Sequence, residues 1–417
     1  MHAGEPGSPP PDGPRPPDGS APPPSIAAQS SAVPLALPLS RRALLTGAAV
    51  ATTATGVLAE AAATPRVAPA ATFAPPSLPF QGPRQSAVRA PQQLYTLLLG
   101  TDQDDPGLPV DTARARLAAL LADWTDVLDR AASGTAPQLL ANDASRSRLT
   151  AAVGIGPALA ARLRLNVPEA LRELPAHPED RLDPARSGAD VLVQLCADDR
   201  WPLTAAADLL QARARGLLTT RWQQSGFLPR EPAGETARNL LGFKDGTANP
   251  GPTDQEQWIW LPPGPHEHGT ILVYRRIHLD TAAFASLALP AQEAAIGRRR
   301  ADGAPLGSHQ EHDEVELWAK HPDGSYVIPA AAHIRLANPR FDAGARILRR
   351  GYSYDDGVHD QGLLFCAYMR DPALFTRVQS RLAATDALAP YVEHRASAVS
   401  YILPGALPGR PLGATLL

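Results

Sequence analysis

The sequence contains little cysteine and almost no net charge. Of its 417 residues, 2 are cysteine, so neither a disulfide framework nor a zinc site of clustered cysteines is expected. Cys196 and Cys366 both stand among apolar residues and are predicted to be buried thiols. The formal net charge of -3 gives no basic surface of the kind that attracts nucleic acid, and we therefore expect no nucleic-acid partner.

Apolar residues, in contrast, make up 44% of the chain, which is enough for one large domain or two fused smaller ones. Residues 1–39 are instead rich in proline, glycine and serine. A segment of this composition buries too little surface to offset its loss of conformational entropy, so we expect it to be disordered. Residues 64–92 are also rich in proline, and we expect them to lie over the surface as an extended arm.

The segment between these two contains the parts of an export signal. The pair Arg41-Arg42 is followed by a weakly apolar stretch of alanine, threonine and glycine, and then by small residues at Ala59, Ala61 and Ala63. This order is typical of a twin-arginine (Tat) signal, which we assign to residues 40–63. The apolar stretch is too short and too polar for a permanent membrane span. We therefore expect export through the Tat translocon, cleavage, and a mature protein that is periplasmic or extracellular.

The rest of the chain divides into two halves with the same order of elements. Helices are predicted where apolar residues recur every three or four positions, and strands where short apolar runs occur. In the first half, 93–240, we expect strands at 94–99, 149–153, 189–196 and 217–222, with one helix capped by Asp111 and another over 204–216. In the second half, 241–417, we expect strands at 270–274, 347–354, 363–369 and 398–403, with helices over 280–296 and 371–383. The repeated order favours an α+β fold of two ferredoxin-like halves packed as one unit.

One segment places an acidic side chain in a constrained loop. Residues 242–250 read GFKDGTANP, so glycines and an Asn-Pro turn surround Asp245. A carboxylate held in such a loop can face a reacting group. On this motif alone, a structural aspartate in an ordinary Asp-Gly turn is an equally good interpretation, because such turns are abundant.

Two further segments carry basic side chains that a site could use. Residues 333–340 read HIRLANPR, and His333 is either a metal ligand or, as is more common for a lone histidine, an exposed or hydrogen-bonded residue. Residues 347–354 read ILRRGYSY and are predicted to form a strand. Neighbouring side chains of a strand point to opposite faces, so only one of Arg349 and Arg350 can line a given pocket.

In this order and at this spacing, the three segments resemble the dye-decolorizing (DyP-type) haem peroxidases. The GxxDG pattern at 242–246 is the signature of that family, and the resemblance extends over essentially the whole mature chain. It looks closest to the Tat-exported branch that includes the deferrochelatase/peroxidase proteins, although Arg84 stands where that branch often has a histidine. The resemblance implies a fold of the dimeric α+β barrel type, with one b-type haem per chain held mainly by the second half.

The resemblance also implies roles for individual residues. His333 matches the proximal ligand of the haem iron, Asp245 the distal acid and base, and Arg349 the distal arginine, for which Arg350 is less suitable. Gly246 adjoins Asp245 in the part of the loop that faces the cofactor.

These roles agree with the chemistry of the side chains. A neutral imidazole is a usual axial ligand in haem peroxidases, and its second nitrogen needs an acceptor, for which Asp386 is the candidate. Heterolytic cleavage of a peroxide moves a proton from one oxygen to the other, which Asp245 can do while Arg349 stabilises the developing negative charge. A free aspartate titrates near pH 3.9, about 2.6 units below histidine, so turnover is expected to be best in acid.

The resemblance therefore predicts an enzyme that reduces hydrogen peroxide and oxidises bulky or outer-sphere donors such as dyes. Two alternatives stay open, namely release of iron from haem, as in the deferrochelatase role, and haem binding without turnover. A carrier would not need an acid and an arginine opposite the ligand. The histidine-containing segments 266–268 and 309–313 are expected to be solvated loops rather than metal sites. The sequence identifies neither the physiological donor nor whether the chain forms a homo-oligomer.

Overall fold

The computed structural model describes residues 78–136, 146–232 and 234–417. The predicted disordered extension (1–39) and the predicted Tat signal (40–63) lie outside these residues, as does the first part of the predicted arm. None of the helices within the described ranges is long and apolar enough to cross a membrane.

The first half contains four described strands and four described helices. The strands are β1 (Tyr95–Gln103), β2 (Thr150–Ile155), β3 (Val191–Ala197) and β4 (Leu218–Phe227). The helices are α1 (Ser86–Arg89), α2 (Val110–Ser133), α4 (Pro157–Arg162) and α5 (Arg200–Ala214).

The second half follows the same plan with more interruptions. Its strands are β5 (Thr270–Leu279), β6 (Leu348–Arg349), β7 (Tyr352–Asp355), β8 (Gln361–Met369) and β9 (Val392–Ile402). Its described helices are α6 (Pro252–Trp258), α7 (Thr281–Ala285), α8 (Leu289–Ile296), α9 (His333–Leu336) and α10 (Ala373–Thr385).

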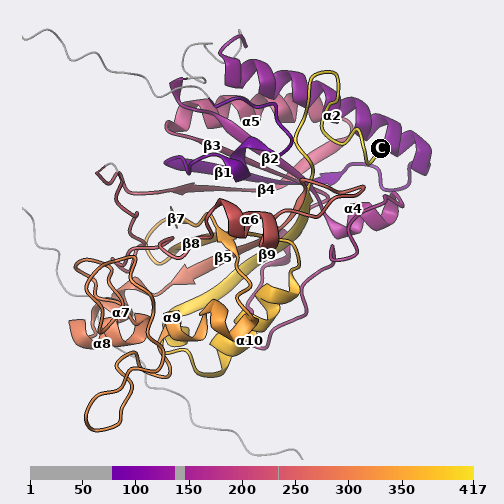
Figure 1. The fold of residues 1–417 in the computed structure, drawn as a ribbon. Coiled ribbons are helices and arrows are strands. Elements are labelled where there is room, and N and C mark those ends of the chain that lie inside the picture. The colour runs from indigo at the N-terminus through magenta and orange to yellow at the C-terminus, as the bar shows by residue number, and fades with distance from the viewer. Residues whose placement is uncertain (1–77, 137–145, 233) are drawn as a thin grey trace, which may run out of the picture. The chain divides into compact units, whose positions relative to one another are not determined.

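The strand order confirms the prediction of two ferredoxin-like halves. The first half pairs its strands in the order β4-β1-β3-β2, and the second in the matching order β9-β5-β8-β7, all antiparallel. The edges of the two halves then join, because β2 pairs with β9 and β4 pairs with β7. Eight strands therefore close into one ring (Figure 1). Strand β6 pairs with the same edge of β8 as β7 does, next to β7 along that edge.

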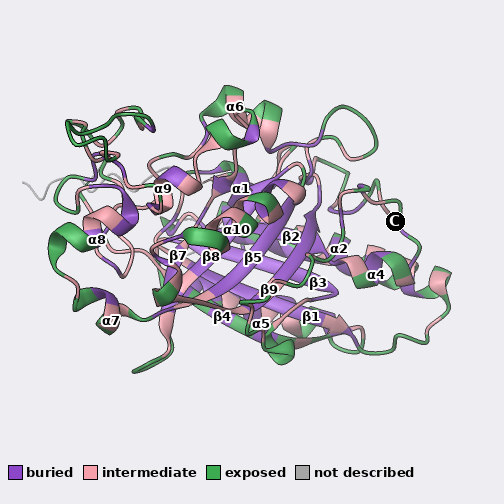
Figure 2. Cartoon of the chain, turned by 90° about the horizontal axis from the view of Figure 1, so that it is seen from below, coloured by how far each residue is buried: buried purple, intermediate pink, exposed green. Residues whose placement is uncertain are grey.

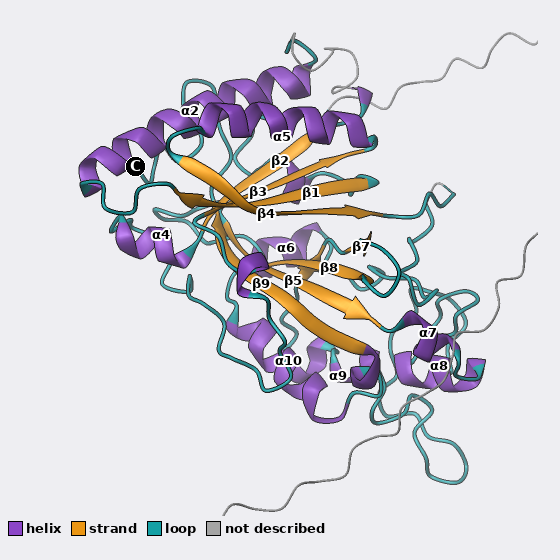
Figure 3. Cartoon of the chain, turned by 180° about the vertical axis from the view of Figure 1, so that it is seen from behind, coloured by secondary structure: helices purple, strands orange, loops and turns teal. Residues whose placement is uncertain are grey.

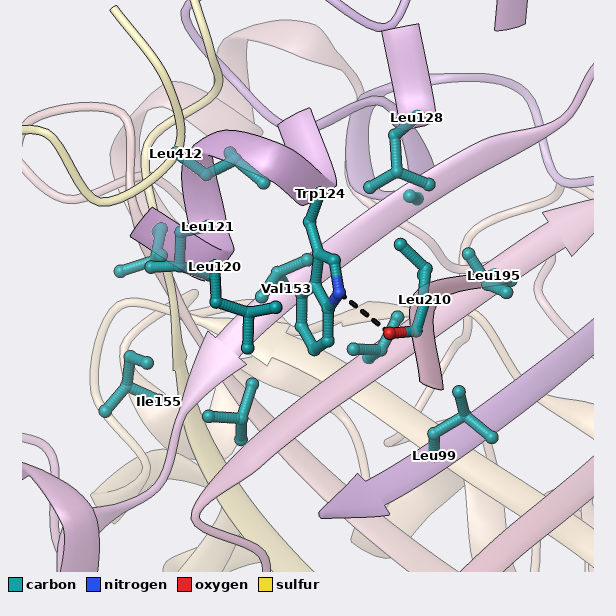
Figure 4. Packing of buried hydrophobic residues seen from close by; sticks show 14 of the residues in the cluster. Leu99, Leu120, Leu121, Trp124, Leu128, Val153, Ile155, Leu195, Leu210 and Leu412 are labelled. Atoms are coloured by element: carbon teal, nitrogen blue, oxygen red, sulfur yellow. Dashed lines mark hydrogen bonds between the residues drawn. The ribbon is translucent and has the colours of Figure 1, made fainter. Parts of the chain in front are cut away.

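Alternate side chains of the closed sheet enter different cores. On the outer face of the first half, β1, β2 and β3 pack against α2 and α5, where the indole of Trp124 donates a hydrogen bond to the Leu210 carbonyl at 3.0 Å (Figure 4). On the outer face of the second half, Phe375 of α10 packs against Val273 of β5 and Met369 of β8, so that α10 lies on the other side of the molecule from α2 (Figure 3). The inner face forms one cluster from both halves, and β1, β2, β3 and β5 are buried along most of their length, whereas β4 alternates buried and exposed residues (Figure 2).

Four details correct the predictions. Residues 86–89 form a helix with Ser86, Ala87 and Val88 buried, rather than part of an extended surface arm. Helix α2 begins at Val110, with Asp111 in its first turn instead of at the cap. The helix expected over 280–296 is divided into α7 and α8, because Pro290 starts a new helix, and the strand expected over 347–354 is interrupted between Arg349 and Tyr352.

Candidate active site

The loop that carries Asp245 lies between β4 and α6, and its backbone has positive φ at two glycines. Gly242 has φ +84° and Gly246 has φ +110°, which are conformations that other residues rarely adopt. The backbone N–H of Asp245 donates to the carbonyl of Ala237 at 2.9 Å. The side chain of Asp245 stays 31% exposed, so the loop fixes the backbone while leaving the carboxylate accessible.

Arg349 of β6 faces this carboxylate. Its Nη1 lies 3.4 Å from Oδ1 of Asp245, and its side chain is also 31% exposed. Asn249 joins the two segments, because its Oδ1 accepts from the backbone N–H of Arg349 at 2.9 Å and its Nδ2 donates to the backbone carbonyl of Arg349 at 2.8 Å. The side-chain amide of Asn249 therefore fixes the position of the loop that carries Asp245, which we call the acid loop, relative to β6, which carries Arg349.

Arg350 points the other way, as the alternation of a strand predicts. It is 4% exposed, and its Nη1 donates to the backbone carbonyls of Val88 and Ala90 at the end of α1. Of the two neighbouring arginines, Arg349 is thus the one beside Asp245, and Arg350 helps to hold the segment that had been predicted as a surface arm.

His333 is the first residue of α9, and a carboxylate fixes its ring. Its Nδ1 lies 2.7 Å from Oδ2 of Asp386, which follows α10 and has a side chain only 5% exposed. The other oxygen of Asp386 accepts from the backbone N–H of Leu388 at 2.9 Å, so the carboxylate itself is held in place. This arrangement assigns the ring proton to Nδ1 and leaves Nε2 with a lone pair. Among the described residues, Nε2 has no hydrogen-bond partner, and the side chain is 32% exposed.

Apolar packing and electrostatics connect the two parts of the site. Phe243 and Leu388, close to Asp245 and to Asp386, belong to one buried cluster, and Ile334, next to His333, packs against it. Gly297 lies so near Ile334 that an added Cβ would come within 2.6 Å of that side chain. The next residue, Arg298, lies near Arg349. Burial, and after it the positive charge of Arg349, lower the pKa of the Arg298 guanidinium.

Sequence reasoning missed one residue that supports the acid loop. Glu311 accepts hydrogen bonds from Lys244 Nζ at 2.8 Å and from Thr247 Oγ1 at 2.9 Å, on either side of Asp245. Burial opposes ionisation of Glu311, but hydrogen bonds from Lys244, Thr236 and Thr247 outweigh it and lower its pKa to about 2. Its side chain is 13% exposed, which corrects the prediction that all of 309–313 is a solvated loop. Glu311 is 64 residues from Thr247 in sequence, and no local pattern links them.

The donor set fits haem. A neutral imidazole with Nδ1 bound to a carboxylate and Nε2 free is a typical axial ligand of haem iron. An acid and a permanent cation, both partly accessible and in contact, suit the polarisation of a peroxide. The fold and these side chains together define the class, an α+β enzyme that uses haem and peroxide.

Comparisons with known proteins are consistent with this class. The profile for the N-terminal part of Dyp-type peroxidases matches residues 85–228, and the profile for the C-terminal part matches residues 236–407. The chain is 38% identical over 359 residues to the dye-decolorizing peroxidase of Thermobifida fusca (strain YX), covering 79% of this chain and 82% of that protein. It is 35% identical over 362 residues to the deferrochelatase of Yersinia pseudotuberculosis, covering 78% and 81%. It also resembles an oxyferrous complex of DtpA from Streptomyces lividans, with TM-score 0.76, 35% identity, and 83% and 99% of the two chains covered.

The chain therefore belongs to the DyP-type peroxidase family. It is an oxidoreductase that acts on peroxide, and haem is the cofactor of this family.

Proposed function

We propose that this chain holds one b-type haem in its second half, with His333 as the axial ligand and with Asp245 and Arg349 on the side where peroxide reacts. The observation that carries the proposal is the orientation of His333, whose Nδ1 is bound by Asp386 while Nε2 is left free. The contact between Asp245 and Arg349 supports the assignment of the opposite side.

Each side chain has a defined task in this proposal. When bound, the haem supplies the redox chemistry of peroxide reduction. Asp245 accepts a proton from one oxygen of hydrogen peroxide through a carboxylate oxygen and delivers it to the other oxygen, which leaves as water. The guanidinium of Arg349 stabilises negative charge on the departing oxygen and orients the carboxylate. The Asp386 carboxylate increases the electron donation of the His333 ring by accepting the Nδ1 proton in a hydrogen bond. Two electrons from reducing substrates, together with two protons from those substrates or from solvent, complete the reduction of one peroxide to two waters.

We also propose that the reducing substrates are bulky or outer-sphere donors such as dyes, as the name of the Thermobifida fusca relative indicates for that protein. The name of the Yersinia relative supports a second candidate, release of iron from haem. The pair of Asp245 and Arg349 favours peroxidase chemistry, because cleavage of the O–O bond uses both a proton carrier and a cation beside the departing oxygen, whereas replacing the iron of a porphyrin by two protons does not require the cation.

The test uses haem-loaded full-length protein and two histidine variants. His333→Ala is expected to lose most of its haem, whereas His312→Ala, which changes a side chain 71% exposed, should keep wild-type haem content and peroxide-dependent dye oxidation. Haem per chain is measured by the pyridine haemochrome assay, and iron-free porphyrin is measured in the same reactions by fluorescence. An unchanged Soret band in His333→Ala would remove this residue from the axial position. Porphyrin formation without peroxide-dependent dye oxidation would favour iron release, and neither activity would indicate a haem carrier.

For export, we propose that residues 40–63 direct the folded, haem-loaded protein through the Tat translocon to the periplasm or the cell exterior. The support is the order of Arg41-Arg42, the weakly apolar stretch and the small residues after it. Changing Arg41 and Arg42 to lysine keeps the charge and should leave unprocessed precursor in the cytoplasm. Normal processing of that double variant, measured by immunoblotting of cell fractions, would contradict the assignment.

A further inference from the structure

The interior of the closed sheet contains polar side chains that peroxidase chemistry does not use. Leu348 and Tyr352 alternate with Arg349 along the chain and point into the inner cluster, and Arg350 lies on this inner side as well. Gln194 of β3 lies between Leu192 and Cys196, which are members of the same inner cluster. The inner cluster is thus separated from Asp245 by the strand that carries Arg349.

Several of these polar atoms have no oxygen or nitrogen as hydrogen-bond partner in the described part of the chain, and those of Gln194 and Tyr352 have only the weakly interacting Cys196 thiol beside them. We call the four side chains that carry them the interior donor cluster: Gln93, Gln194, Arg350 and Tyr352. The unpartnered atoms are Nε2 of each glutamine, Nε and Nη2 of Arg350, and the hydroxyl of Tyr352. Arg350 is 4% exposed and the other three residues are fully buried. Every one of these atoms is a hydrogen-bond donor, and only the Tyr352 hydroxyl can also accept.

The members of the interior donor cluster lie close to Cys196 or Cys366: Gln93 precedes β1, Gln194 belongs to β3, Arg350 lies between β6 and β7, and Tyr352 begins β7. The backbone N–H of Arg350 donates to the carbonyl of Cys366 at 2.8 Å. Gln93 accepts from the hydroxyl of Thr150 at 3.3 Å, and that hydroxyl also lies 3.4 Å from the Cys196 carbonyl.

Gln194 and Tyr352 are the other two members of the cluster. The carbonyl oxygen of Gln194 is taken by the hydroxyl of Tyr368, so its amide nitrogen is the part left over. The Cys196 thiol is near Gln194, Tyr352 and Arg350, since all three influence its pKa.

No negative group of residues 78–136, 146–232 and 234–417 balances Arg350. Among the described residues, no carboxylate oxygen lies within the 4.0 Å of its guanidinium that would make an ion pair. Burial raises the pKa of both Cys196 and Cys366, so the two thiols stay neutral near pH 7. An unpaired buried cation with unmet donors is strongly unfavourable. Water alone is a poor solution, because each water would bring hydrogens that need acceptors and would leave the charge uncompensated.

We propose that the interior donor cluster binds one small inorganic anion of halide size. A spherical anion beside Arg350 can accept hydrogen bonds from several such donors and compensates the charge of Arg350. The site is distinct from the peroxide side of the enzyme, because Arg349 and Arg350 point to opposite faces of one strand.

Bromide is the probe for this site, with the full-length, haem-loaded protein. Crystals grown from halide-free gluconate buffer with added sodium bromide should show an anomalous peak at the Arg350 guanidinium. In solution, bromide at constant ionic strength should raise the midpoint of thermal unfolding, and the unfolding constant should fall about 100-fold when bromide reaches 100 times its Kd. The Soret band, recorded in the same titration, reports separately any halide that binds at the iron.

Tyr352→Phe removes one donor while keeping the ring, and it should weaken the bromide dependence at least several-fold. Arg130→Leu, which changes a side chain 58% exposed, is the matched control and should leave the bromide dependence unchanged. Arg350→Met should abolish both the anomalous peak and the bromide dependence if it folds. Density that refines as water alone, together with thermal stability that is equal in bromide and gluconate, would overturn the proposal. Equal bromide dependence in wild type and Tyr352→Phe would overturn it as well.

Discussion

At the residue scale, the partner of each side chain decides what that side chain can do. Arg349 and Arg350 are neighbours of the same type, yet one contacts a partly exposed carboxylate and the other is enclosed. The sequence alone left Asp245 equally suited to a structural turn, and only the resemblance to a family favoured a catalytic role. The structure places Asp386, the candidate acceptor for the second ring nitrogen, at Nδ1 of His333, 53 residues away in the sequence.

The acid and the arginine should be separable by kinetics. Asp245→Asn removes the proton carrier and should slow the reaction with peroxide by about 10²- to 10⁴-fold, the range typical of general acid–base catalysis. Arg349→Leu should slow it at least as much, because no other described cation contacts Asp245. The rate is measured by stopped-flow from the change of the Soret band across pH 3 to 8, with haem content as the control. If Asp245→Asn reacts at the wild-type rate at every pH while Arg349→Leu does not, the aspartate is a structural turn residue.

A second residue-scale prediction concerns the support of the ligand. Asp386→Asn keeps an oxygen for the Leu388 amide but removes the negative charge beside Nδ1 of His333. The reduction potential of the bound iron should become more positive, and activity should fall by about 10- to 100-fold, as is usual when a group that orients a metal ligand is changed. Spectroelectrochemical titration measures the potential, and Asp371→Asn, which changes an exposed helix-capping residue, is the control. An unchanged potential in Asp386→Asn would show that this carboxylate has no electronic effect on the ligand.

At the scale of elements, the sequence predicted what periodicity controls and missed what long-range contacts control. Helix α5 and strands β1 and β3 lie close to where apolar patterns placed them, because α5 buries one face in the outer core and the side chains of the strands alternate between the two cores. Helix α1 could not be predicted, since four residues carry no periodic signal and its stability comes from Arg350, about 260 residues away, and from Gln85, which bonds to β2. The support of the acid loop could not be predicted for the same reason, because Glu311 contacts Lys244 in the fold but is distant from it in the sequence.

Glu311 gives the acid loop a pH-dependent support. Its pKa is about 2 in the folded protein against an ordinary value of 4.5, so the unfolded chain binds the extra proton first as the pH falls. The stabilisation is therefore complete above about pH 4.5 and is lost progressively towards pH 2. Glu311→Gln should lower the midpoint of thermal unfolding at pH 6, and its difference from wild type should vanish near pH 2. The control is Glu314→Gln, since that side chain is 69% exposed. A constant difference between wild type and Glu311→Gln from pH 6 to pH 2 would mean that the charge of Glu311 does not stabilise the loop.

At the scale of the whole molecule, the two halves complete each other. They meet at two strand junctions, β2 with β9 and β4 with β7, and, counting only the eight strands of the ring, each junction joins the second strand of one half to the fourth strand of the other. The inner cluster draws apolar side chains from both halves, including Leu98 and Trp222 from the first and Leu272 and Tyr368 from the second. Neither half can therefore bury its inner face alone.

The fragment 78–232, expressed without the second half, should accordingly not stay monomeric. It would expose β2 and β4 as edge strands, together with the inner-face residues Leu98 and Trp222, and unpaired edges with apolar side chains promote association. Because both natural junctions join a second strand to a fourth, two copies of the fragment can form the same ring by pairing β2 of each with β4 of the other. Light scattering after size-exclusion chromatography should thus show a dimer, or larger aggregates where pairing continues beyond two copies. Co-expression with 234–417 should convert the fragment to a one-to-one complex. Strands β9 and β7 of the second half then compete with the second copy of the fragment for pairing with β2 and β4. A fragment that is monomeric, with native-like circular dichroism and no tendency to associate, would show that the first half is stable without the closed sheet.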